Sequence, residues 1–224
     1  MTFFDSYSYY LKIVLLKLKN EAEEQLKSFI EYAKVKTGHY VSFFRSDGSG
    51  EYSLDSLKKY FKLHSIYHEL TNPDTPQENG SAEYINCTIL DMAYTIIKES
   101  ELLESFWSYA VNYATYILNR ISIHAIKKNI IFYQAYTGNK LFVVYLQVFG
   151  CTAHALIPKN KRSKFGSKSL QCIYLGYSSR KKAYILFYHP SSQLFEFQNV
   201  CFDEGSEVED TRVVIDPSPS DCPA

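Results

Sequence analysis

The chain has 224 residues, 46% hydrophobic and 21% charged, and these proportions exclude a disordered chain, a collagen-like repeat and a coiled coil as the main state. This length suits one large or two small domains with a sizeable core. Apolar runs such as Leu141 to Leu146 fall far short of the ~18 residues of a membrane-spanning helix, so we expect no membrane segment and no signal peptide. Five scattered cysteines without a Cys-x-x-Cys pair favour a reducing, intracellular setting.

The formal net charge is zero, but the charges are segregated along the chain. Residues 1–104 carry 11 Lys and Arg against 16 Asp and Glu, and residues 196–224 carry 1 against 8. Between them, residues 105–195 carry 12 Lys and Arg and no acidic residue. This basic segment is typical of a polyanion-binding surface; the alternative is that it only balances the acidic parts of its own chain.

The first half of the chain predicts alternating strands and helices. A turn at residues 5–8 precedes a strand over 9–18, and the later elements are a helix over 21–37, a strand over 40–44, a helix over 53–64 and a strand over 66–70. This order indicates an α/β fold.

A loop and a group of helices are expected next. Residues 71–80, with two prolines and an Asn-Gly pair, predict the loop. The helix after it has an apolar face at positions 85, 89, 92 and 96, and it is followed by a long helix over 101–120 and a short one over 131–136 that ends at Gly138.

From residue 144 the pattern changes to short strands, predicted over 149–157, 172–177, 183–188 and 194–202, which indicate a small antiparallel β unit. The acidic, proline-bearing end of the chain predicts a flexible tail. We therefore expect an α/β domain at 1–120, a helical linker at 121–143, a β barrel at 144–204 and an acidic tail at 205–224.

Two carboxylates stand where a divalent cation is often bound. Asp47 follows a predicted strand, and Glu83 is expected in the first turn of the helix after the loop. Mg²⁺ prefers oxygen ligands and takes few of them from protein when phosphate and water supply the rest. The alternative is structural, because a helix N-terminus stabilises a carboxylate without any metal.

The residues around both carboxylates, 44–52 and 71–83, resemble the paired motifs of the integrase core of copia-type long-terminal-repeat retrotransposons. The likeness reaches residue 204 through residues 105–107, 110–112, 116–120, 148–151 and 172–178. It implies an RNase H-like integrase core that lacks its first strand, followed by a small all-β SH3-like barrel. It also implies DNA cutting and joining with Mg²⁺ or Mn²⁺ held by three carboxylates, of which Asp47 matches the second and Glu83 the third.

The same resemblance places three loop residues beside DNA: Pro76, Gln77 and Asn79. Two basic runs are further candidate phosphate contacts: Lys159, Lys161, Arg162 and Lys164, and then Arg180, Lys181 and Lys182. The first run also suits a nuclear-import signal or a plain solvated loop.

The first catalytic Asp of the family lies on a strand that would precede Met1, and Asp5 is expected to face solvent from a turn. We therefore expect a catalytically incomplete integrase fragment with exposed strand edges. The resemblance implies an intracellular, nuclear location, DNA partners (retroelement ends and target DNA), and a second copy or an intact integrase as protein partner. The alternatives are a non-catalytic DNA-binding or protein-interaction module that uses the basic segment 105–195, and a decayed element without function.

Overall fold

The computed structural model describes residues 1–46, 55–71, 76–121, 131–138, 146–158, 160, 162, 164, 166–178 and 180–205, with the backbone alone for 76–79 and 81. The chain forms two compact units. The first unit comprises Met1–Ile89 and Thr115–Phe142, and the second comprises Leu90–Ala114 and Val143–Ala224. No helix in the described ranges is long and apolar enough to cross a membrane.

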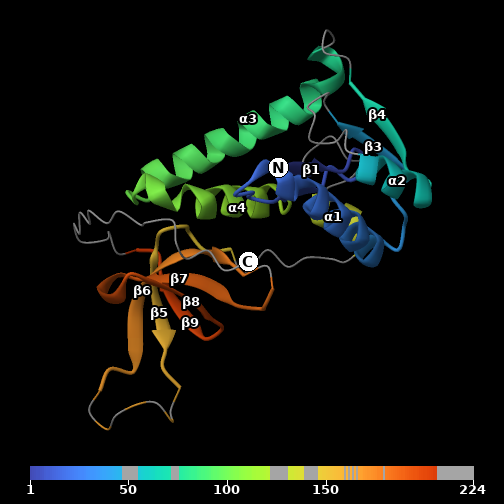
Figure 1. Ribbon diagram of the computed structural model, residues 1–224. Coiled ribbons are helices and arrows are strands. Elements are labelled where there is room, and N and C mark those ends of the chain that lie inside the picture. The colour runs from blue at the N-terminus through green and yellow to red at the C-terminus, as the bar shows by residue number, and fades with distance from the viewer. Residues whose placement is uncertain are drawn as a thin grey trace. The chain divides into compact units, whose positions relative to one another are not determined.

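The first unit is built from strands and helices that alternate, as the sequence predicts (Figure 1). An antiparallel hairpin of β1 (Thr2–Phe4) and β2 (Leu11–Ile13) comes first. A 3₁₀ turn leads to α1 (Ala22–Thr37), and β3 (Phe43–Ser46) pairs in parallel with β4 (Tyr67–Leu70), with α2 (Asp55–Leu63) between them in the chain. Helix α5 (Phe132–Thr137) also belongs to this unit, whereas α3 (Pro76–Glu99) and α4 (Trp107–Leu118) each contribute residues to both units.

The hairpin turn is organised by Asp5. Its carboxylate accepts hydrogen bonds from the backbone N–H of Ser8, at 2.9 Å, and from the Ser8 hydroxyl, which belongs to a fully buried residue. Tyr9 has a left-handed backbone, with φ of 59°, and its N–H donates to the Asp5 carbonyl at 2.7 Å. The turn at 5–8 is therefore confirmed. The strand predicted over 9–18 is shorter, at Leu11–Ile13, and it begins later than predicted because the left-handed Tyr9 cannot be part of a strand.

Helix α1 is confirmed almost to the residue. Ala22, Leu26, Ile30 and Ala33 repeat at helical spacing and are buried. The helix ends at Gly38, whose φ of 74° is the left-handed conformation that glycine adopts without strain, and its N–H donates to the Lys34 carbonyl.

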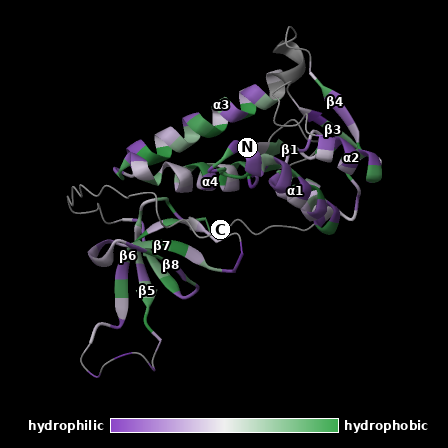
Figure 2. Ribbon diagram, viewed as in Figure 1, coloured by the Kyte–Doolittle hydropathy of each residue, from purple (hydrophilic) through white to green (hydrophobic). Residues whose placement is uncertain are grey.

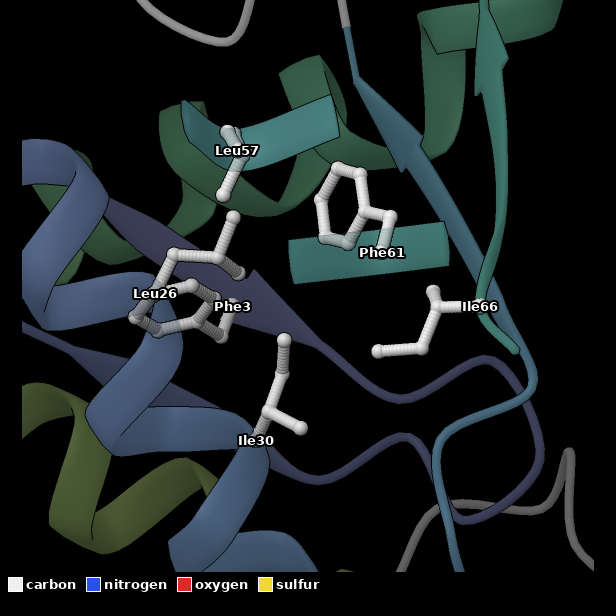
Figure 3. Close-up of a cluster of buried hydrophobic side chains, with 6 residues drawn as sticks. All are labelled: Phe3, Leu26, Ile30, Leu57, Phe61 and Ile66. Atoms are coloured by element: carbon white, nitrogen blue, oxygen red, sulfur yellow. The ribbon is translucent and has the colours of Figure 1, made fainter. Parts of the chain in front are cut away.

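Six buried apolar side chains form the main core of the first unit (Figure 3). They converge from four segments and are Phe3, Leu26, Ile30, Leu57, Phe61 and Ile66. The Phe29 ring stacks on Phe3 with 4.1 Å between centroids. Burial of this apolar surface stabilises the packing of the hairpin, α1, α2 and the residue before β4 against one another.

The outer edge of β2 is completed by a side chain. Alternate residues of an antiparallel hairpin turn their backbone N–H and C=O away from the partner strand. The buried amide of Asn119 accepts a hydrogen bond from the Leu11 N–H at 2.8 Å and donates to the Leu11 carbonyl at 2.7 Å. The amide thus supplies the two bonds that a neighbouring strand would supply.

Helix α3 begins earlier than the sequence predicts. The loop expected over 71–80 is wrong in its second half, because the backbone is already helical from Pro76. Proline suits the first helical position, since its missing N–H has no partner there in any case. Hydrophobic and hydrophilic bands alternate along α3 (Figure 2), with Ile89 and Ala93 buried and Leu90 and Tyr94 exposed.

The second unit contains a five-stranded antiparallel sheet with the order β8-β7-β6-β5-β9, so the small antiparallel β unit is confirmed. The strands are β5 (Thr152–Leu156), β6 (Ser169–Tyr177), β7 (Tyr184–Tyr188), β8 (Gln193–Phe197) and β9 (Val200–Asp203). The single strand predicted over 194–202 is wrong, because a bend at 198–199 sends β9 to the opposite edge, where it pairs with β5. The predicted tail beyond residue 205 lies outside the described residues.

Helical residues 90–114 pack on this sheet within the second unit. The rings of Phe106 and Phe187 lie 5.1 Å apart, and the Tyr113 hydroxyl donates to the Gln147 carbonyl at 2.5 Å. Gly150 has a φ of +83°, and a Cβ built there would lie only 2.5 Å from the Ser100 Cβ. The chain therefore passes the end of α3 at a distance that only glycine permits.

Candidate functional site

The best-defined part of the site is the C-terminal end of the parallel pair β3 and β4. The Thr71 N–H, just after β4, donates to the Ser46 carbonyl at 3.0 Å. Ser46, the last residue of β3, is buried and stands directly before Asp47 in the chain. Parallel strands carry functional loops at their carboxyl ends, and this edge is the place where the sequence predicts the metal site.

A second bond fixes the same position. The Ser46 hydroxyl and the His68 Nε2 lie 2.9 Å apart. His68 is half-buried against the rings of Phe44 and Phe61, at 5.4 and 5.0 Å between centroids. Burial lowers the pKa of His68, so the ring is neutral near pH 7 and bonds the hydroxyl without a buried charge.

The two predicted catalytic carboxylates differ in how far the structure describes them. Asp47 lies outside the described residues. Glu83 is exposed on α3, and because the helix begins at Pro76, Glu83 lies beyond the first turn where the sequence analysis expects it. The helix N-terminus therefore does not explain the presence of this carboxylate.

The donor chemistry of the pair fits a hard divalent cation, since carboxylate oxygens are the ligands that Mg²⁺ and Mn²⁺ take from proteins. No group of three or more His, Cys, Asp or Glu that could hold a metal ion occurs among the residues with described positions. Asp5, the remaining acidic candidate in the sequence, is engaged by Ser8 in the hairpin turn. Its carboxylate serves the fold of that turn.

The three residues expected beside DNA, Pro76, Gln77 and Asn79, lie on the helical backbone at the start of α3, and their side chains lie outside the description. They therefore belong to a helix and not to the loop that the sequence predicts. This regular backbone presents them at helical spacing along one segment.

The turn between β6 and β7 is a compact basic surface. Arg180, Lys181 and Lys182 are all exposed. The Ser178 hydroxyl accepts hydrogen bonds from the backbone N–H groups of Arg180 and Lys181, each at 3.2 Å, and these bonds fix the backbone of the turn. The Lys181 ammonium also pairs with Glu196 on β8 at 3.2 Å. Bonds from Ser178 and Lys181 lower the pKa of Glu196, which stays ionised beside the turn.

The basic run at 159–164, between β5 and β6, is described only in part. Lys159 and Lys161 lie outside the described residues. Lys164 is exposed, whereas the Arg162 Nε donates to the Ile157 carbonyl and so helps to shape the loop. Of this run, Lys164 is the described cation that is most open to a phosphate.

Two features of the first unit have little signal in the sequence. His68 was not selected, since the residue it bonds is 22 positions away. The only signal in the sequence was a histidine and a serine on two strands that were both predicted. Asn119 was part of a matched motif, but its bonding to Leu11 over 108 positions has no local signature.

Comparison with known proteins gives these features a context. Residues 151–215 match the family model of the retroviral polymerase SH3-like domain. The chain is 34% identical over 208 residues to the retrovirus-related Pol polyprotein from transposon TNT 1-94 of Nicotiana tabacum, which covers 93% of this chain and 16% of the relative. The Pol polyprotein from transposon RE1 of Arabidopsis thaliana is 29% identical over 90% of this chain and 14% of its own length. The chain thus spans about one sixth of the length of the curated relatives it matches.

A solved structure shares the fold. A chain of the simian T-cell lymphotropic virus intasome, determined in complex with PP2A regulatory subunit B56 gamma, matches with a TM-score of 0.50 over 88% of this chain and 68% of that chain. The identity is 15%, so the likeness is one of fold alone. The resemblance to retrotransposon Pol polyproteins is therefore confirmed, and so is the fold class, an α/β core with the fold of that intasome chain followed by a small all-β SH3-like part.

Proposed function

We propose that the chain is an integrase-related segment of a retrotransposon Pol polyprotein that binds DNA and carries two of the three carboxylates of a metal site, Asp47 and Glu83. The proposal is carried by the hydrogen bonds that fix Ser46 at the end of β3. Ser46 is held there by hydrogen bonds from two positions around β4, directly before Asp47. The neighbouring motif residues lie on α3, the helix that follows β4, so both motifs belong to successive elements of one unit.

Two divalent ions bound by such carboxylates activate an attacking water or 3′-hydroxyl and stabilise the leaving oxygen of an in-line displacement. The residues of this chain would hold and place the reacting groups. Asp47 and Glu83 supply oxygen ligands, and the Ser46–His68 bond fixes the strand end that leads to Asp47. The exposed cations of the 180–182 turn bind backbone phosphate.

Two carboxylates leave a two-metal site short of negative charge, so we propose that residues 1–224 alone do not transfer strands. The test is a Mn²⁺ titration by calorimetry, followed by a strand-transfer assay on labelled DNA ends. We expect weak Mn²⁺ binding that Asp47→Asn and Glu83→Gln each abolish, and that the matched control Asp55→Asn, on the exposed start of α2, leaves unchanged. Binding that survives both substitutions refutes the metal site, and strand transfer that Asp47→Asn abolishes refutes the incompleteness.

A second candidate is a non-catalytic DNA-binding or protein-interaction module. The observation that favours it is the ordered basic turn of Arg180, Lys181 and Lys182, in a segment without acidic residues. If the chain is such a module, we expect salt-dependent binding to duplex DNA. This binding should survive substitution of Asp47 and Glu83 and should be lost when the cations between 159 and 182 become Gln. A decayed element without function would bind neither Mn²⁺ nor DNA. If the chain does bind DNA, we propose that it acts in the nucleus.

A further inference from the structure

Two ammonium groups in the first unit converge on one aromatic ring, far in sequence from the basic segment. The Lys12 Nζ, from β2, lies 3.8 Å from the ring centroid of Tyr32 on α1. The Lys36 Nζ lies 5.7 Å from the same centroid. Phe29, one helical turn before Tyr32, adds a second ring 6.0 Å from the Lys12 Nζ.

Among the described residues, no carboxylate pairs with either of these two ammonium groups. Other lysines of the same unit have acidic partners, as Lys27 has in Glu23 at 2.6 Å and Lys58 in Asp55 at 3.7 Å. Within the part of the chain that the structure describes, Lys12 and Lys36 form no ion pair with an acidic residue. Partial burial lowers the pKa of Lys12, and the nearby charge of Lys36 lowers it further. An anion placed between the two groups would relieve this repulsion.

The helix end explains only half of the arrangement. Lys36 stands in the last turn of α1, where a cation offsets the helix dipole without any ligand. Lys12 has no such role, since it stands in a hairpin strand opposite Phe3. Its side chain is nevertheless brought over the helix, to the ring that Lys36 also approaches.

The parts of the site are held in place before any ligand arrives. The backbone of Lys12 is fixed by the hairpin, and that of its neighbour Leu11 by Asn119. The Tyr32 hydroxyl lies 3.4 Å from the hydroxyl of the buried Tyr10. A ligand that binds here therefore orders few groups, which lowers the free-energy cost of binding.

We propose that Lys12, Lys36 and Tyr32 form a binding site for the phosphate backbone of DNA. The site rests on the proposed function and extends the DNA contact to a region with a net negative sequence charge, outside the basic segment 105–195. The strand backbone suits two fixed cations, because its charge repeats about every 3.4 Å along the axis on each strand. The aromatic ring keeps both ammonium groups at one surface without neutralising them.

The test compares two double variants of equal charge change. Lys12→Gln/Lys36→Gln removes the site, and Lys59→Gln/Lys62→Gln removes two exposed lysines of α2 that have no acidic or aromatic partner among the described residues. The affinity of the full chain for a short DNA duplex is measured between 50 and 200 mM salt. Each phosphate contact contributes about −0.9 to the slope of log K against log salt, so the site variant should flatten that slope by about 1.8.

The control variant should change the slope by less than half of this amount, and unfolding curves establish that both variants fold. An unchanged slope in a folded Lys12→Gln/Lys36→Gln variant overturns the site. If the slope is unchanged in that variant and substitution of the 180–182 cations still weakens DNA binding, the proposed function stands and only the site fails. If the unmodified chain does not bind duplex DNA, both proposals fail. The DNA site is also overturned if Lys12→Gln/Lys36→Gln loses binding to RNA or to an acidic protein but binds duplex DNA as well as the unmodified chain does.

Discussion

The bond between Asn119 and the edge of β2 leads to a quantitative prediction. In Asn119→Ala, the N–H and C=O of buried Leu11 lose their partners together. A buried polar group left without a hydrogen bond costs about 1–3 kcal/mol, so the loss of two such bonds should lower the free energy of unfolding by about 2–6 kcal/mol. Asn119→Leu keeps the branching but has a larger side chain, so it leaves no cavity, and it should be almost as destabilising because both Leu11 groups still lose their partners.

The measurement is urea unfolding followed by circular dichroism. The control is Asn112→Ala on α4, the helix that ends just before Asn119; the exposed amide of Asn112 donates to the Ser108 carbonyl at 3.0 Å. It should change the free energy of unfolding by less than about 0.5 kcal/mol. If Asn119→Leu unfolds at the same urea concentration as the unmodified chain, the amide carries no net stabilisation and the prediction is wrong.

Three further predictions follow from buried or strained positions. Gly150→Ala places a Cβ against Ser100 at a positive φ, so it should destabilise by about 2–4 kcal/mol, measured by thermal unfolding; an unchanged midpoint would contradict the close approach. Burial raises the pKa of the Cys151 thiol to about 12, so at neutral pH iodoacetamide should modify the exposed Cys87 quickly and Cys151 only after unfolding, as peptide mass spectrometry would reveal. Because burial lowers the pKa of His68 in the folded state, the unfolded chain binds its proton first, and stability should fall as the pH drops below about 6.5. His68→Gln should flatten this acid dependence, and an identical dependence in the variant would exclude His68 as its source.

Local patterns in the sequence predicted much of the fold. Helix α1 follows from apolar spacing and from Gly38, which ends it. The turn at Asp5 follows from residues that bond their own backbone. The start of α3 did not follow, because Pro76 is compatible with both a loop and a first helical turn. The split between β8 and β9 is decided by pairing with β5, a contact over some 45 positions that no local pattern encodes.

The candidate site was predictable where one segment carries the signal. The turn of Arg180, Lys181 and Lys182 is a run of cations, and its exposure agrees with that pattern. Pairs that form only in the fold were not predictable. The Ser46–His68 bond joins neighbouring strands, and the Lys12–Lys36 pair joins a strand to a helix within a net acidic region. Both depend on the register and facing of elements and not on composition.

The packing of residues 90–114 on the β sheet limits how this chain can be divided. Phe106 rests on Phe187, and Tyr113 bonds the carbonyl of Gln147 ahead of β5. A cut at residue 143 would leave those surfaces of the sheet bare in water. A chimera that takes only the strands from a related chain should therefore aggregate, whereas one that carries the helical residues along should remain dispersed.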